Sequence, residues 1–136
     1  MIGIKSPIYL LLLLTIFSLS SCSEKNTDDA NEAYTYWAGA KPNSDIKLLN
    51  GQYWQSAHWS KEYIIFLKFK PSKLWRDEFI KQNNLTVNED EWTMPENAPL
   101  WFAPSTNSIR YSSSNSELGY FFEVKTGIFY IYEIQY

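Results

Sequence analysis

The feature that most constrains how this chain can fold is its single cysteine, Cys22. One cysteine cannot form a disulfide within one chain, so the fold depends on what the other side chains can bury. Twenty-two of the 24 Trp, Tyr and Phe residues lie in residues 34–136. Each aromatic side chain buries roughly 150–250 Å², which lets a domain of this size stabilise itself without cross-links. The sequence therefore predicts one domain with an aromatic core.

The first 22 residues have the order of a secretory leader. Residues 1–6 carry Lys5, residues 8–19 are apolar apart from Thr15 and Ser18, and small residues precede the cysteine. This order is typical of a cleaved signal. The apolar run of 12 residues is shorter than the roughly 20 that a spanning helix needs. The alternatives are an uncleaved membrane helix and a secreted protein whose cysteine has no role.

The Leu-Ser-Ser-Cys stretch at positions 19–22 resembles the lipobox of bacterial lipoprotein precursors. In that family the cysteine thiol takes a diacylglyceryl group and the leader is cut off. The resemblance implies that residues 1–21 are removed and that Cys22 anchors the mature chain to a membrane of the cell envelope. An aspartate after the cysteine tends to retain such proteins at the inner membrane, and Ser23 stands there. This implies the outer membrane, with the domain facing either the periplasm or the cell surface.

Charge separates the next segment from the rest. Residues 23–33 are polar and acidic, with Glu24, Asp28, Asp29 and Glu32 against Lys25, and we expect residues 22–33 to form the lipidated end and a flexible tether. Residues 34–136, the expected single domain, are close to neutral and lack the basic footprint of a nucleic-acid-binding protein. We expect a monomer that binds no nucleic acid.

The middle of the chain predicts a strand followed by a helix. Residues 63–70 alternate in a pattern typical of a strand that is covered on both sides at its start. Ser72 is a good N-cap for a helix over residues 73–83, in which Leu74, Trp75, Phe79 and Ile80 form one stripe. Asn50-Gly51 is a turn signal.

The end of the chain predicts a β-hairpin. Residues 120–124 and 128–135 are rich in aromatic and β-branched residues, and residues 125–127 supply a tight turn. Residues 86–118 are punctuated by prolines and predict a long irregular region with a short strand near residues 108–112. The expected fold class is α+β: a small antiparallel sheet with one main helix packed on it and a C-terminal hairpin.

His58 is the one histidine, between Trp54 and Trp59. A catalytic histidine needs a nucleophile, an orienting acid and an oxyanion hole, and no nucleophile elbow or glycine-rich loop is present. We therefore expect His58 to wedge between aromatic rings or to bond at the surface. One histidine and a lipidated cysteine cannot build a zinc site, and the acidic run at residues 88–91 lacks the spacing of a calcium loop. No cofactor or metal is expected.

Residues 99–104 present Trp101 and Phe102 between prolines. Two interpretations stay open: these rings form the wall of a binding groove, or they plug an open end of the core, which is where aromatic side chains usually lie. The candidate binding residues are Trp54, His58, Trp59, Trp101 and Phe102.

These patterns predict a non-enzymatic, membrane-anchored module that binds a protein of the cell envelope. An inhibitor or an immunity protein would be a concrete form of such a module. The alternative is a glycan-binding accessory lipoprotein that stacks sugars on exposed Trp and Tyr. A small hydrolase built around His58 is a third hypothesis.

Overall fold

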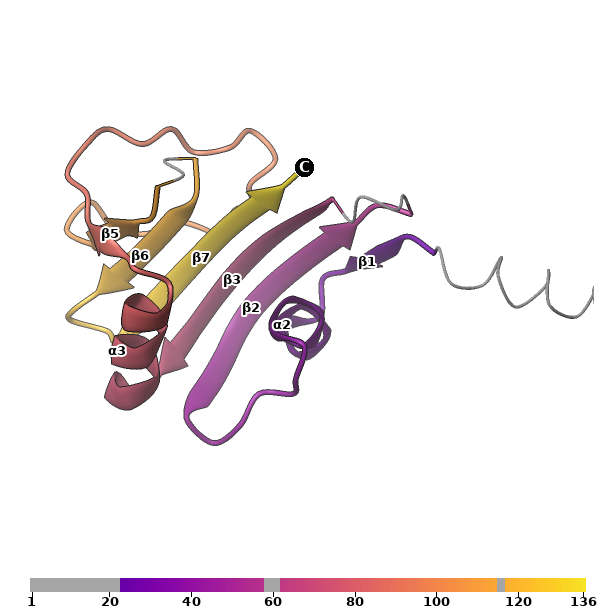
Figure 1. The fold of residues 1–136 in the computed structure, drawn as a ribbon, viewed down its shortest axis with the longest axis horizontal. Coiled ribbons are helices and arrows are strands. Elements are labelled where there is room, and N and C mark those ends of the chain that lie inside the picture. Colours follow the sequence, from indigo (N-terminus) through magenta and orange to yellow (C-terminus); the bar gives the residue numbers. More distant parts are fainter. Residues whose placement is uncertain (1–22, 58–61, 115–116) are drawn as a thin grey trace, which may run out of the picture.

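The computed structural model describes residues 23–57, 62–114 and 117–136, so Cys22, His58 and Trp59 lie outside the described residues. The described residues form one antiparallel sheet in the strand order β1-β2-β3-β7-β6-β5-β4 (Figure 1). Its strands are β1 (Lys25–Thr27), β2 (Ile46–Gln55), β3 (Tyr63–Pro71), β4 (Thr86–Val87), β5 (Ile109–Ser112), β6 (Gly119–Glu123) and β7 (Ile128–Gln135), and the helices are α2 (Ala30–Ala38) and α3 (Lys73–Gln82).

The fold class is α+β as predicted, but the sheet has seven strands and is not small. The chain crosses from β3 through α3 to the opposite edge at β4, and then returns strand by strand until β7 pairs with β3. The predicted strand, the helix with its Ser72 cap and the C-terminal hairpin are all present. In the described part of the chain, no helix has the length and apolarity needed to cross a membrane.

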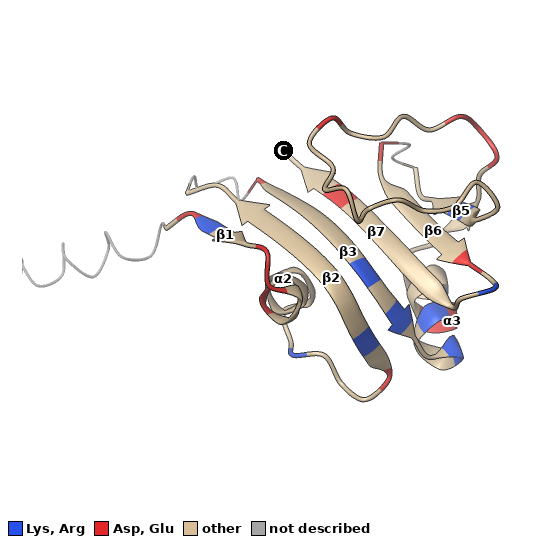
Figure 2. Cartoon of the chain, turned by 180° about the vertical axis from the view of Figure 1, so that it is seen from behind, with Lys and Arg blue, Asp and Glu red and all other residues tan. Residues whose placement is uncertain are grey.

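Both sides of the sheet carry an aromatic core. Both helices cover one side, called here the helix side (Figure 1). Residues 88–108, called here the covering segment, cross the opposite side, called here the far side (Figure 2). The molecule therefore has three layers, because β3 and β7 are apolar on both sides and need a cover on each.

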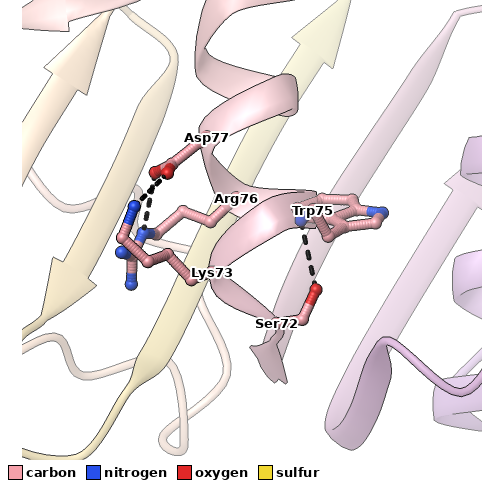
Figure 3. Close-up of polar contacts among 5 residues, drawn as sticks. All are labelled: Ser72, Lys73, Trp75, Arg76 and Asp77. Atoms are coloured by element: carbon pink, nitrogen blue, oxygen red, sulfur yellow. Dashed lines mark hydrogen bonds and ion pairs between the residues drawn. The ribbon is translucent and has the colours of Figure 1, made fainter.

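Helix α3 begins where its sequence predicts. The Ser72 hydroxyl accepts a hydrogen bond from the backbone N–H of Trp75 at 3.1 Å, and the Lys73 ammonium binds the Asp77 carboxylate at 2.6 Å (Figure 3). The hydrogen bond from Lys73 lowers the pKa of Asp77 below its usual value. Trp75 packs on the core of the helix side, whereas Lys73 and Asp77 lie on another side of the helix and face solvent (Figure 3). The guanidinium of Arg76 lies over the ring of Phe122, 3.9 Å from its centre.

One detail of the predicted packing is wrong. Leu74 does not join Trp75 and Phe79 in the interface with the sheet, since 65% of its surface is exposed. Tyr130 and Tyr132 belong to the far-side core and not to the core beneath the helix. Successive residues of a strand point to opposite sides, so these two tyrosines cannot share a core with the neighbouring Phe129.

The expectation of a flexible tether up to residue 33 is wrong for the described part of that segment. Strand β1 pairs with the end of β2, where Lys25 lies opposite Gln55. Helix α2 begins at Ala30, because the Asp29 carboxylate caps it by accepting a hydrogen bond from the backbone of Glu32 at 2.9 Å. Ala33 is fully buried. The folded domain therefore begins three residues after Cys22.

The predicted turn at Asn50-Gly51 is also wrong, because both residues lie inside β2. A β-carbon on Gly51 would stand 3.0 Å from the Cα of Ala30 and 3.0 Å from the side chain of Ala33. Gly51 is therefore the point where α2 approaches the sheet most closely, a contact that local sequence does not reveal.

Candidate interaction surface

Two aromatic anchors hold the covering segment to the far side. The ring of Trp92 packs edge-on against that of Phe121, with 5.0 Å between the ring centroids. A β-carbon added to Gly119 would lie only 2.9 Å from the indole of Trp92. The absence of a side chain at Gly119 thus makes room for the indole, whose Nε1–H donates to the carbonyl of Glu117 at 3.2 Å. An irregular segment of this length is fixed by such side-chain contacts because few backbone hydrogen bonds tie it to the sheet.

Phe102 is the second anchor and is only 2% exposed. Its ring lies 5.1 Å from Phe66 of β3 and 5.5 Å from Tyr130 of β7, in edge-to-face contacts. Two interpretations of residues 99–104 were open, a binding wall and a plug of the core. Phe102 is a core residue, since it has almost no exposed surface for contact with a ligand. Trp101 is half-buried and packs on the same cluster, with its ring 6.2 Å from that of Phe102.

Leu100 lies beside these anchors and is completely exposed. The backbone N–H of Phe102 donates to the carbonyl of Pro99 at 2.9 Å, which closes a tight turn with Leu100 and Trp101 at its centre. Pro99 fixes one end of the turn and buried Phe102 fixes the other. Leu100 was not among the candidate residues predicted from the sequence, which pointed to the aromatic pair Trp101 and Phe102.

Two open clefts of about 530 and 590 Å³ flank residues 88–94 of the covering segment. Both are lined by Trp92, Met94 and buried Arg110, whose guanidinium donates to the carbonyl of Asp90 at 2.9 Å. The backbone of the acidic run at residues 88–91 is thereby tied to Arg110 at Asp90. Among the described residues, no group of three or more acidic, histidine or cysteine side chains could hold a metal ion.

The remaining candidate residues are not gathered into one site. Trp54 lies on β2 and is half-buried, and its Nε1–H donates to the Glu24 carboxylate at 2.7 Å. Trp101 belongs to the covering segment, so the two tryptophans come from different elements. His58 and Trp59 fall outside the described residues, and nothing in the geometry bears on them.

A polar cluster on the helix side was not foreseen. The carboxylate of Glu133 in β7 accepts hydrogen bonds from the Trp37 indole at 3.2 Å, from the Tyr63 hydroxyl at 3.2 Å and from the Tyr120 hydroxyl at 3.1 Å. Burial, followed by the charge of Glu133, raises the pKa of both tyrosines well above the usual value. The cluster joins α2, β3, β6 and β7, and these three donors are neutral groups. Its arrangement is that of a structural brace across the sheet.

Comparison of the chain with models of protein families, with curated proteins and with solved structures finds no match.

Proposed function

We propose that this protein is a lipid-anchored, non-enzymatic module that binds another protein of the cell envelope. The lipobox-like stretch before Cys22 supports the anchor, and Ser23 after it favours the outer membrane. An inhibitor or immunity protein is the concrete form that we favour, since such a protein needs a stable scaffold and an exposed contact surface but no catalytic group.

The observation that carries the binding role is the completely exposed Leu100 on its anchored turn. An exposed leucine on a mobile loop would have to be ordered on binding, which lowers affinity. Here Pro99 and Phe102 hold the turn before any partner arrives. Protein interfaces are organised around apolar side chains that enter a pocket on the partner, and Leu100 has the position and rigidity for this role. The two clefts beside residues 88–94 are lined by other parts of the same covering segment.

Photo-crosslinking in intact cells tests this proposal. A photoreactive residue is placed at position 100 and, as the matched control, at position 74, because Leu74 is also an exposed leucine but lies on α3 on the helix side. We expect one discrete crosslinked protein from position 100 and none from position 74. Equal labelling from both positions, or labelling of neither, would contradict the proposal. Tryptophan quenching by soluble sugars together with absent crosslinks would favour the glycan-binding alternative.

A further inference from the structure

The larger of the two clefts, of about 590 Å³, has an aromatic and apolar centre. It is lined by Trp92 and Met94 of the covering segment and by Tyr132 and Tyr136 at the end of the chain. Met94 is 40% exposed and Tyr136 is 81% exposed. Exposed apolar surface that borders a cleft is typical of a contact site for another molecule.

The rim of this cleft is acidic. It carries the carboxylates of Asp90, Glu91, Glu96 and Glu117, and Arg110 is the single basic side chain among the described residues that line it. Both ion pairs found among the described residues belong to Asp77, so Asp90, Glu91 and Glu96 form none there. These carboxylates around an apolar centre give the cleft a negative potential.

Hydrogen bonds hold the walls of the cleft in place. The backbone N–H of Asp90 donates to the side-chain oxygen of Asn88 at 2.8 Å, and the carbonyl of Asp90 accepts from Arg110 at 2.9 Å. The Trp92 indole is held by the carbonyl of Glu117. The cleft is therefore formed before a ligand arrives, which reduces the ordering that binding must pay for.

The lysines of the far side do not line this cleft. Lys47 lies opposite Lys70 near the start of β7, and the ammonium of Lys68 lies 5.8 Å from the ring centre of Tyr130 (Figure 2). Tyr136 is six residues beyond Tyr130, roughly 20 Å along the strand direction, whereas the Debye length is about 8 Å at physiological salt. The lysines therefore do not cancel the negative potential at the Tyr136 end of the cleft.

We propose that this cleft receives a basic segment of the partner protein, with an arginine guanidinium against the aromatic lining and hydrogen-bonded to the carboxylates of the rim. This inference rests on the proposed function and names the chemistry of its partner. A guanidinium suits both parts of the cleft, because its plane stacks on aromatic rings and its N–H groups bind carboxylates in pairs. Leu100 belongs to the same covering segment, so the partner presents an apolar pocket to Leu100 and a basic segment to the cleft.

A tri-arginine peptide, acetylated and amidated at its ends, tests the cleft without the partner. Met1 and Met94 are the two methionines of the chain, so the methyl NMR signal of Met94 in the full-length protein in detergent reports on the cleft. We expect a saturable shift of this signal with tri-arginine, weaker binding in high salt, and no shift with the uncharged tri-citrulline peptide.

Two double variants locate the binding site. Glu91→Gln/Glu96→Gln should weaken the binding of tri-arginine about tenfold or more. The matched control, Asp28→Asn/Glu78→Gln, removes the same charge from exposed positions outside the cleft and should leave binding unchanged. Equal binding of the two peptides, or equal binding by the two double variants, would overturn the inference.

The photo-crosslink from position 100 separates this inference from the proposed function. If Glu91→Gln/Glu96→Gln leaves the yield of the crosslinked partner unchanged, the partner does not use the cleft, and the inference is wrong while the binding role stands. If tri-arginine binds as expected but position 100 crosslinks no protein, the binding role of Leu100 is wrong and the preference of the cleft for a guanidinium stands.

Discussion

At the scale of single residues, the side chain of Glu133 links three other elements of the fold to β7. Its carboxylate accepts hydrogen bonds from one indole and two phenols that come from α2, β3 and β6. A charged acceptor strengthens such bonds, and removing it would leave half-buried donors without a partner. This one side chain therefore couples the N-terminal helix to the C-terminal half of the sheet.

The same cluster predicts a loss of stability at alkaline pH. Burial and then the charge of Glu133 raise the pKa of Tyr63 and of Tyr120. Unfolded tyrosines ionise near pH 10, so above that pH the folded state holds more protons than the unfolded state. The free energy of unfolding should be constant with respect to these groups below about pH 9 and fall as pH rises through 10 and beyond.

Chemical denaturation at a series of pH values measures this effect. The free energy of unfolding of the double variant Tyr63→Phe/Tyr120→Phe should fall less steeply above pH 10 than that of the natural protein. The variant lacks two phenols that lose their protons more readily in the unfolded chain than in the folded one. The control is Tyr136→Phe, which removes an exposed hydroxyl. An unchanged slope in the double variant would show that these phenols are not responsible.

At the scale of elements, the helices and the covering segment cover the sheet in different ways. Helix α3 has a regular stripe, in which Trp75 and Phe79 stack at 5.0 Å and face the sheet. The covering segment has no repeating pattern and relies on two separate anchors, Trp92 and Phe102. Its stability is therefore concentrated in a few side chains, whereas that of α3 is distributed along the helix.

This difference predicts contrasting effects of two substitutions that lie two residues apart. Phe102→Ala should lower the free energy of unfolding by about 3–5 kcal/mol, because it leaves a cavity between β3, β6 and β7. Leu100→Ala should change it by less than about 0.5 kcal/mol, because the side chain is exposed. Denaturant unfolding of both variants checks this prediction. Comparable losses in the two variants would mean that Leu100 is packed and is not a free contact residue.

Local pattern predicted the elements whose signals are local. The alternation of β3, the Ser72 cap of α3 and the hairpin of β6 and β7 each depend on neighbouring residues, and each is present. Helix α2 was missed because its acidic composition suggested a tether. Its signals are nevertheless present: Asp29 caps the helix, Glu32 follows three residues later and Gly39 ends it.

The rest depends on long-range packing that the sequence pattern does not show. Gly51 looks like a turn until α2 is known to pack on it, and Phe102 could not be assigned to core or surface until Phe66 and Tyr130 were placed around it. The candidate surface was predicted only in part. Its segment, residues 99–104, was identified, but the exposed side chain is Leu100 and not the aromatic pair.

At the scale of the whole molecule, the proposed lipid on Cys22 would determine what the domain can reach, because β1 begins only three residues later. A long tether would let the domain rotate freely, whereas the two residues between Cys22 and Lys25 would hold one corner of the sheet at the bilayer if Cys22 carries the proposed lipid. Two or three acyl chains make such an anchor stable, since each buried methylene contributes about 0.8 kcal/mol.

The intact mass of the protein extracted from its native membranes tests this account most directly. We expect a chain that begins at Cys22, lacks residues 1–21 and carries the added mass of a diacylglyceryl group on the cysteine. Substitution Cys22→Ser should abolish both the cleavage and the added mass. A leader still attached to the extracted protein, or a free thiol at Cys22, would contradict the account.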